Sequence, residues 1–272
     1  MRYPALDIHG ADADLVLALV DDFAPTAVED LAGGISIFFT TASKRDDATA
    51  AVAAALPDAH LSSREVDDED WAKRSQQNLT PITVGRITVT PPWFAEAPPA
   101  QTPHAELLVT ILPSMGFGTG HHATTRLCLA ALQSLDVDGR RVLDVGTGSG
   151  VLAIAAAALG ALEALGIDFD QDAIANAREN LELNPTITGV RFETVDVRDA
   201  ALPSADIVLA NLTGAVLLQN AALLRSAVAP GGTLIVSGLQ THERAGVLGA
   251  FAGATVQRQD DELDWVALTF NF

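Results

Sequence analysis

The sequence has few of the features that mark disulfide-stapled or membrane-spanning chains. Its 272 residues include one cysteine, Cys128, which excludes a disulfide scaffold and fits a reducing compartment. The first residues lack the basic and apolar regions of a secretory signal. No uncharged apolar run reaches the roughly 18 residues of a membrane span, and the longest candidate, 151–162, is too short. We therefore expect a soluble, cytoplasmic protein with no membrane partner.

Basic residues are also scarce. Lys and Arg number 16 against 35 Asp and Glu, which gives a net charge of −19. We find no local basic patch, so direct binding to nucleic acid is not expected. Residues 1–80 alone contain six basic and 15 acidic residues, a net charge of −9. An acidic surface of this kind could attract a basic partner, although a solvated face explains the same pattern.

The chain is nonetheless rich enough in apolar residues, at 49%, to exclude a disordered protein. Its length suggests one large domain or two. In the first 66 residues, the pattern predicts strands at 3–8, 26–31, 35–41 and 60–66 and helices at 12–22 and 45–56. This β-α-β-β-α-β order predicts a small ferredoxin-like α+β domain over 1–66. An acidic run and a linking helix are expected within 67–80.

The second part, 81–272, has a different pattern. Paired strands are expected at 82–84 and 86–90, a proline-rich loop at 91–103, and an apolar helix that contains Leu127, Leu129 and Leu132. Further on, strands at 142–145, 164–168, 190–195, 207–210 and 233–237 alternate with helices at 151–159, 171–184 and 214–229. This alternation predicts an α/β domain with a doubly wound, mostly parallel sheet. Two final strands, 255–259 and 264–270, predict an antiparallel hairpin at its edge.

Doubly wound sheets bind ligands at the carboxyl ends of their strands, so residues just after the strands are the site candidates. Gly146 and Gly148 lie in a glycine-rich turn that allows close approach of a ligand, although a tight turn needs none. The dinucleotide pattern G-x-G-x-x-G is broken here by Val151. Asp168 follows Gly146 by 22 residues and could accept the ribose hydroxyls of either NAD or S-adenosylmethionine. Asp170, two residues on, is interpreted as a helix N-cap.

Two later strands end in polar residues as well. Asp196 could accept a hydrogen bond from an adenine amine, and a surface acid is an equally good explanation. Asn211 carries both an acceptor and donors, which suits the orientation of an amine nucleophile, while an Asx turn is the alternative.

The segment 113–125 contains three glycines beside Phe117, Thr119 and two histidines, which suggests a lid over a ligand. His121 and His122 could bind a metal, but no carboxylate partner lies at a useful spacing, so no metal is expected. Cys128 falls on the apolar helix and is interpreted as a core thiol rather than a nucleophile.

Together these segments resemble a class I S-adenosylmethionine-dependent methyltransferase, and more narrowly the bacterial ribosomal protein L11 methyltransferase family. The run F-G-T-G-x-H-x-T-T is intact at Phe117–Thr125, and D-x-G-T-G-S-G-x-L-A-I is intact at Asp144–Ile154. Gly166–Asp168, Ala210–Asn211 and Pro230–Gly232 fit as well. The resemblance implies a seven-stranded methyltransferase sheet over 81–272, a substrate-recognition domain over 1–66 and a linker helix at 67–80.

The resemblance also implies the chemistry. The expected reaction is methyl transfer from S-adenosylmethionine to lysine side chains, and to an N-terminal amine, of a basic ribosomal protein, with S-adenosylhomocysteine as product. The residues expected to bind the cofactor are Thr125, Gly146, Gly148, Asp168, Asp196 and Asn211. Asn211 would also orient the amine, Phe117 and Thr119 would belong to the lid, and a monomer is expected.

Three other interpretations stay open. The chain could methylate another protein or a small molecule, or it could bind a partner without catalysis. An NAD-dependent oxidoreductase is opposed by Val151 in the glycine-rich turn and by the lid motif.

Overall fold

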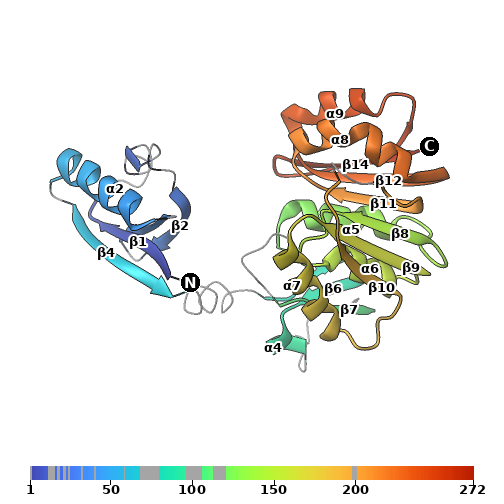
Figure 1. Ribbon diagram of the computed structural model, residues 1–272, viewed down its shortest axis with the longest axis horizontal. Coiled ribbons are helices and arrows are strands. Elements are labelled where there is room, and N and C mark those ends of the chain that lie inside the picture. The colour runs from blue at the N-terminus through green and yellow to red at the C-terminus, as the bar shows by residue number, and fades with distance from the viewer. Residues whose placement is uncertain are drawn as a thin grey trace. The chain divides into compact units, whose positions relative to one another are not determined.

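The computed structural model describes residues 2–11, 16, 19–20, 23, 25–31, 33–39, 41–57, 59–67, 80–95, 106–112, 121–197 and 201–272. The chain divides into two compact units, Met1–Asn78 and Leu79–Phe272, each described here by itself (Figure 1). The expected linker helix, apart from its ends, and the lid residues Phe117 and Thr119 lie outside the described residues. Within those residues, no helix is both long and apolar enough to cross a membrane.

The N-terminal unit contains a four-stranded sheet in the order β2-β3-β1-β4. Its strands are β1 (Arg2–His9), β2 (Pro25–Leu31), β3 (Gly34–Phe39) and β4 (His60–Asp67), and all neighbours are antiparallel. Helix α2 (Ala42–Ala55) lies along one face (Figure 1), where its Ala48 and Val52 pack with Leu6 and Ile37. Of the helix expected at 12–22, the described Val16, Leu19 and Val20 are helical.

A small sheet opens the second unit. As expected, β5 (Ile82–Val84) and β6 (Ile87–Thr90) are antiparallel, and Gly85 takes the positive φ of 55° that their tight turn requires. The sequence pattern missed β7 (Leu107–Thr110), which pairs in parallel with β6. The loop expected at 91–103 is wrong at one place, because Pro92–Ala95 form a single helical turn, α4, with proline at its favoured first position.

The large sheet has seven strands in the order β10-β9-β8-β11-β12-β14-β13. Neighbours from β10 to β12 are parallel, while β14 is antiparallel to both β12 and β13. This confirms the doubly wound sheet and the antiparallel edge hairpin. The strands are β8 (Arg141–Val145), β9 (Glu163–Asp168), β10 (Val190–Thr194), β11 (Ala205–Asn211), β12 (Val228–Gln240), β13 (Thr255–Glu262) and β14 (Trp265–Asn271).

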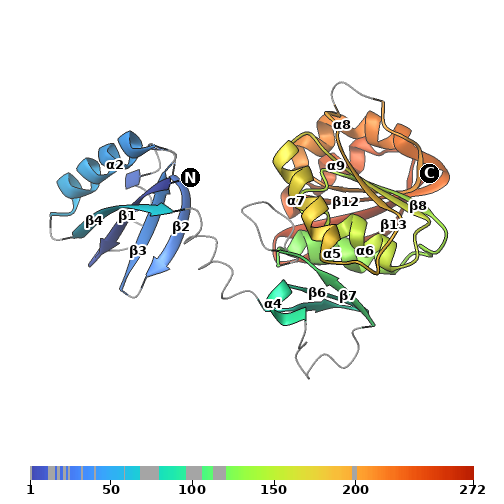
Figure 2. The ribbon, with the colours of Figure 1, turned by 60° about the horizontal axis from the view of Figure 1, so that its bottom comes forward.

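Helices cover both faces of this sheet. On one face, α5 (Ala123–Gln133), α6 (Val151–Ala158) and α7 (Gln171–Glu182) share a buried apolar cluster with the small sheet, and Figure 2 shows β6 and β7 beside α5 and α6. On the other face, α8 (Gly214–Ala227) and α9 (Arg244–Ala250) pack around Leu217, Leu224 and Val247. Cys128 is fully buried in the first cluster, which confirms its interpretation as a core thiol.

Candidate functional site

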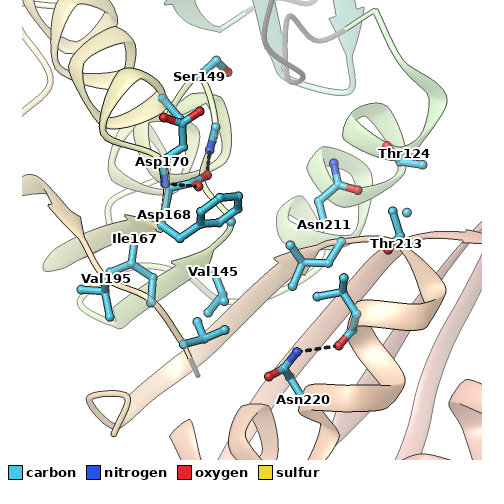
Figure 3. A pocket seen from close by; sticks show the side chains of 18 of the residues that line it. Thr124, Val145, Ser149, Ile167, Asp168, Asp170, Val195, Asn211, Thr213 and Asn220 are labelled. Carbon is cyan, nitrogen blue, oxygen red and sulfur yellow. Dashed lines mark hydrogen bonds between the residues drawn. The ribbon is translucent and has the colours of Figure 1, made fainter. Parts of the chain in front are cut away.

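The candidate site is a cavity of about 1310 Å³ at the carboxyl ends of β8, β9, β10 and β11 (Figure 3). This is the edge where a doubly wound sheet is expected to bind its ligand. Six residues singled out from the sequence line it together, namely Thr125, Gly146, Gly148, Asp168, Asp196 and Asn211. The chain order separates these residues widely, and the parallel topology brings them to one place.

The glycine-rich turn after β8 is held by its main chain. Gly146 and Gly148 have φ angles of 72° and 53°, a region that strongly favours glycine. The N–H groups of Gly146 and Thr147 both donate to the carbonyl of Ile167 at 2.9 Å, which ties the turn to β9. A Cβ at Gly146 would lie 2.4 Å from the Leu212 side chain, so no larger residue fits without a rearrangement.

Asp168 ends β9 and is fixed by two main-chain hydrogen bonds. Its Oδ2 accepts the Gly148 N–H at 3.0 Å, and its Oδ1 accepts the Asp170 N–H at 3.1 Å (Figure 3). A carboxylate has about four acceptor positions, so each oxygen can still accept from a ligand. Asp170 in turn accepts the Asp172 N–H at 2.9 Å and caps α7, which confirms its interpretation as an N-cap.

Asp144 lies buried under the same turn, with 1% of its surface exposed. Burial raises its pKa to about 7, an effect that a hydrogen bond from the Thr147 hydroxyl at 2.6 Å partly offsets. Burial, with the Asp144 charge as a second cause, also raises the pKa of the Cys128 thiol. Cys128 is therefore protonated at neutral pH, which does not suit a nucleophile.

The opposite wall comes from the start of α5 and the start of β14. His122 caps α5, since its Nδ1 accepts the Thr124 N–H at 3.4 Å and lies 2.8 Å from the Thr124 hydroxyl. Its ring meets Trp265 edge-on, with centroids 4.8 Å apart. His121 makes a hydrogen bond of 2.8 Å with the carbonyl of Thr80. Both imidazoles are therefore positioned by contacts within the protein.

An ion pair holds this wall to the sheet edge. The Arg126 guanidinium, from α5, donates to the Glu262 carboxylate on β13, with Nε 2.9 Å from Oε1, and also to the His121 carbonyl. The hairpin that carries Trp265 is thereby fastened to the helix that carries His122. Sequence reasoning missed Trp265, because it belongs to no motif and reaches the cavity only through the antiparallel pairing of the last hairpin.

The chemistry of the lining suits an adenosine-sized ligand. Carboxylates at Asp168 and Asp196 can accept hydrogen bonds from hydroxyl or amino groups. The lining also includes apolar side chains that can cover a flat heterocycle, namely Val145, Ile167, Phe169, Val195, Val197 and Leu212. The volume of about 1310 Å³ lies above the roughly 300–1,000 Å³ of typical small-molecule pockets, so a nucleoside cofactor can be accommodated.

This sheet order, with a glycine-rich turn after the first parallel strand and an acid after the second, defines a class I methyltransferase fold. A model of the family described as ribosomal protein L11 methyltransferase (PrmA) matches residues 21–272. The chain therefore belongs to the ribosomal protein L11 methyltransferase family.

Individual relatives agree with this assignment. A ribosomal protein L11 methyltransferase from Deinococcus radiodurans is 43% identical over 182 residues, which cover 65% of each chain. One from Geobacter metallireducens is 42% identical over 207 residues, which cover 75% of this chain and 66% of that one. The chain thus spans just under two thirds of the length of these relatives. The crystal structure of a ribosomal protein L11 methylase from Lactobacillus delbrueckii subsp. bulgaricus matches with a TM-score of 0.62 and 27% identity, over 71% of this chain and 97% of that one.

Proposed function

We propose that the protein transfers methyl groups from S-adenosylmethionine to amino groups of ribosomal protein L11 and releases S-adenosylhomocysteine. The target groups are lysine side chains and the N-terminal amine. The observation that carries this proposal is the convergence of Gly146, Asp168 and Asn211 on one cavity, in a chain that belongs to a family named for this reaction.

The residues that would hold the cofactor follow from their chemistry. Asp168 would accept hydrogen bonds from the ribose hydroxyls, and Asp196 would accept one from the adenine amine. Gly146 and Gly148 would let the main chain lie against the cofactor, and Thr125 would close the cavity from α5. When bound, S-adenosylmethionine supplies a methyl group activated by a positively charged sulfur.

The protein's own part in the reaction is mainly positioning. Asn211 ends β11, and Figure 3 shows it on the side of the cavity that Thr124 and Thr213 also border. Its amide oxygen would accept a hydrogen bond from the neutral amine and orient the nitrogen lone pair. The amine loses its proton to water before the attack, so the site needs no strong base. Phe117 and Thr119 are proposed to exclude water as part of a lid.

We also propose that residues 1–66 form a ferredoxin-like recognition module, joined to the methyltransferase domain by a linker helix at 67–80. Two observations support this proposal: the antiparallel order β2-β3-β1-β4, and α2 between β3 and β4. The net charge of −9 in residues 1–80 would attract a basic substrate and disfavour direct contact with nucleic acid. A ribosomal substrate places the reaction in the cytoplasm.

The test is intact-protein mass spectrometry of purified, unmethylated ribosomal protein L11 after incubation with this protein and S-adenosylmethionine. We expect a gain of whole methyl units that is lost in the Asp168→Ala variant. If L11 gains no mass while S-adenosylmethionine binding is demonstrated, the substrate is another protein or a small molecule. If the cofactor does not bind at all, a non-catalytic binding protein becomes the better explanation.

A further inference from the structure

Two asparagines are buried four residues apart, Asn180 within α7 and Asn184 just after the end of that helix. Asn180 has 0% of its surface exposed and Asn184 has 5%. A buried primary amide is costly unless its donors and acceptor find partners, so such a pair needs a reason. Neither residue lines the cavity.

The hydrogen bonds of Asn180 lead directly to the cavity wall. Its Oδ1 accepts the N–H of Leu112, two residues after β7, at 2.8 Å. Its Nδ2 donates to the carbonyl of Ser149 at 2.9 Å and to Oδ1 of Asn176 at 2.8 Å. Ser149 and Asn176 both line the cavity, and Figure 3 shows Ser149 near Asp168 and Asp170. One buried side chain therefore connects two lining residues to the main chain after β7.

These bonds fix two properties of the wall. The bond to the Ser149 carbonyl sets the orientation of the last peptide of the glycine-rich turn. This peptide leads into Gly150, the N-cap residue of α6, which makes no side-chain capping hydrogen bond. The bond to Asn176 engages one lone pair of its amide oxygen and so fixes which end of that amide carries the NH₂ donors. Without Asn180, the amide of Asn176 could turn over and present an acceptor instead.

We propose that Asn180 is a positioning residue for the adenosyl cofactor: it holds the glycine-rich turn at Ser149 and orients Asn176 as a donor. This inference rests on the proposed function, because it assumes that the cavity binds S-adenosylmethionine. It adds a residue that acts from outside the cavity, through hydrogen bonds, on the affinity of the site.

Asn184, two residues beyond the end of α7, provides a matched control. Its Oδ1 accepts the Thr110 N–H at 2.8 Å, and its Nδ2 donates to the carbonyls of Thr110 and Asn180 at 2.7 Å. It therefore braces β7 against α7 with the same chemistry and burial, but none of these partners is a lining residue of the cavity.

The experiment compares Asn180→Asp with Asn184→Asp in the full-length protein. Each change keeps the size of the side chain and the acceptor for a main-chain N–H, while leaving at most one of the two amide donors. Isothermal titration calorimetry with S-adenosylhomocysteine gives the Kd, and thermal unfolding without ligand gives the stability of each variant. We expect similar losses of Tm in both variants, with a Kd at least tenfold higher for Asn180→Asp and within about twofold of wild type for Asn184→Asp.

A second variant keeps the inference testable if Asn180→Asp fails to fold. Asn176 is only partly buried, so Asn176→Ala should fold normally and should also weaken S-adenosylhomocysteine binding several-fold. Equal Kd changes in the two buried-asparagine variants, or a Kd for Asn176→Ala that matches wild type, would overturn the role of Asn180. Either result would leave the proposed function standing, provided that the wild-type protein binds S-adenosylhomocysteine. If the wild-type protein does not bind it, the proposed function and the role of Asn180 are both overturned.

Discussion

Replacement of Asp168 by alanine tests the cofactor assignment most directly. The change removes the only carboxylate that the structure places against both the glycine-rich turn and the start of α7, among the residues it describes. Two ribose hydroxyls would lose a charged acceptor. Hydrogen bonds to charged groups contribute about 1.5–3 kcal/mol each, so the lower value gives a loss of about 3 kcal/mol. That corresponds to a Kd raised on the order of a hundredfold.

Asp206→Ala is the matched control for this experiment. Asp206 accepts the main-chain N–H of Arg141 at 2.9 Å, as Asp168 accepts that of Gly148. Asp206 and Arg141 lie at the starts of β11 and β8, so they are at the end of the parallel strands away from the cavity. We expect it to lower the Tm without changing affinity. The assay is calorimetric titration of each variant with S-adenosylhomocysteine. A Kd for Asp168→Ala within threefold of wild type, in a folded variant, would refute the reasoning.

Four further predictions follow from the site. Asn211→Ala should lower kcat about a hundredfold through lost orientation of the amine and should weaken S-adenosylhomocysteine binding much less; an unchanged methyl-transfer rate would contradict this role. Burial raises the pKa of Asp144 from 3.8 to about 7, so the folded protein binds an extra proton and its stability falls as pH rises through that range. Asp144→Asn lacks this penalty and should melt higher than wild type at pH 8, by a margin that shrinks toward pH 5; a lower melting temperature at pH 8 counts against it. Arg126→Leu removes the ion pair with Glu262 and should raise the KM for the protein substrate several-fold, with unchanged cofactor affinity. Arg258→Leu removes a different ion pair on β13, with Asp260, and should change neither the KM nor the cofactor affinity. Methylation of a basic substrate should slow as salt rises, and a rate independent of salt would argue against electrostatic attraction.

The large sheet could be predicted because most of its parallel strands are short apolar runs that alternate with helices. Such a repeated pattern admits few topologies. The segment Leu107–Thr110 has no such context: it is four residues long and pairs in parallel with β6 across a long connection, so only tertiary structure identifies it as β7. For a similar reason α9, seven residues long, was not expected.

The candidate site shows the same division. Gly146, Asp168 and Asn211 could be singled out because each lies at or just after the carboxyl end of a parallel strand, and these ends converge. Trp265 and Asn180 could not be found in this way. Trp265 reaches the cavity through the register of an antiparallel hairpin. In the sequence, Asn180 is one polar residue among several in a predicted helix. Only its three side-chain hydrogen bonds in the structure distinguish it from the other polar residues of α7.

The two main-chain hydrogen bonds of Asp168 have a consequence for turnover. A methyltransferase must exchange spent product for fresh cofactor in every cycle, and between these events its site is empty. A free carboxylate would then sample several rotamers and would lose about 0.5–1.5 kcal/mol of conformational freedom each time a ligand returned. Because the N–H groups of Gly148 and Asp170 hold both oxygens of Asp168, much of that loss occurs during folding. For the proposed reaction, the site would then keep its receptive shape from one cycle to the next.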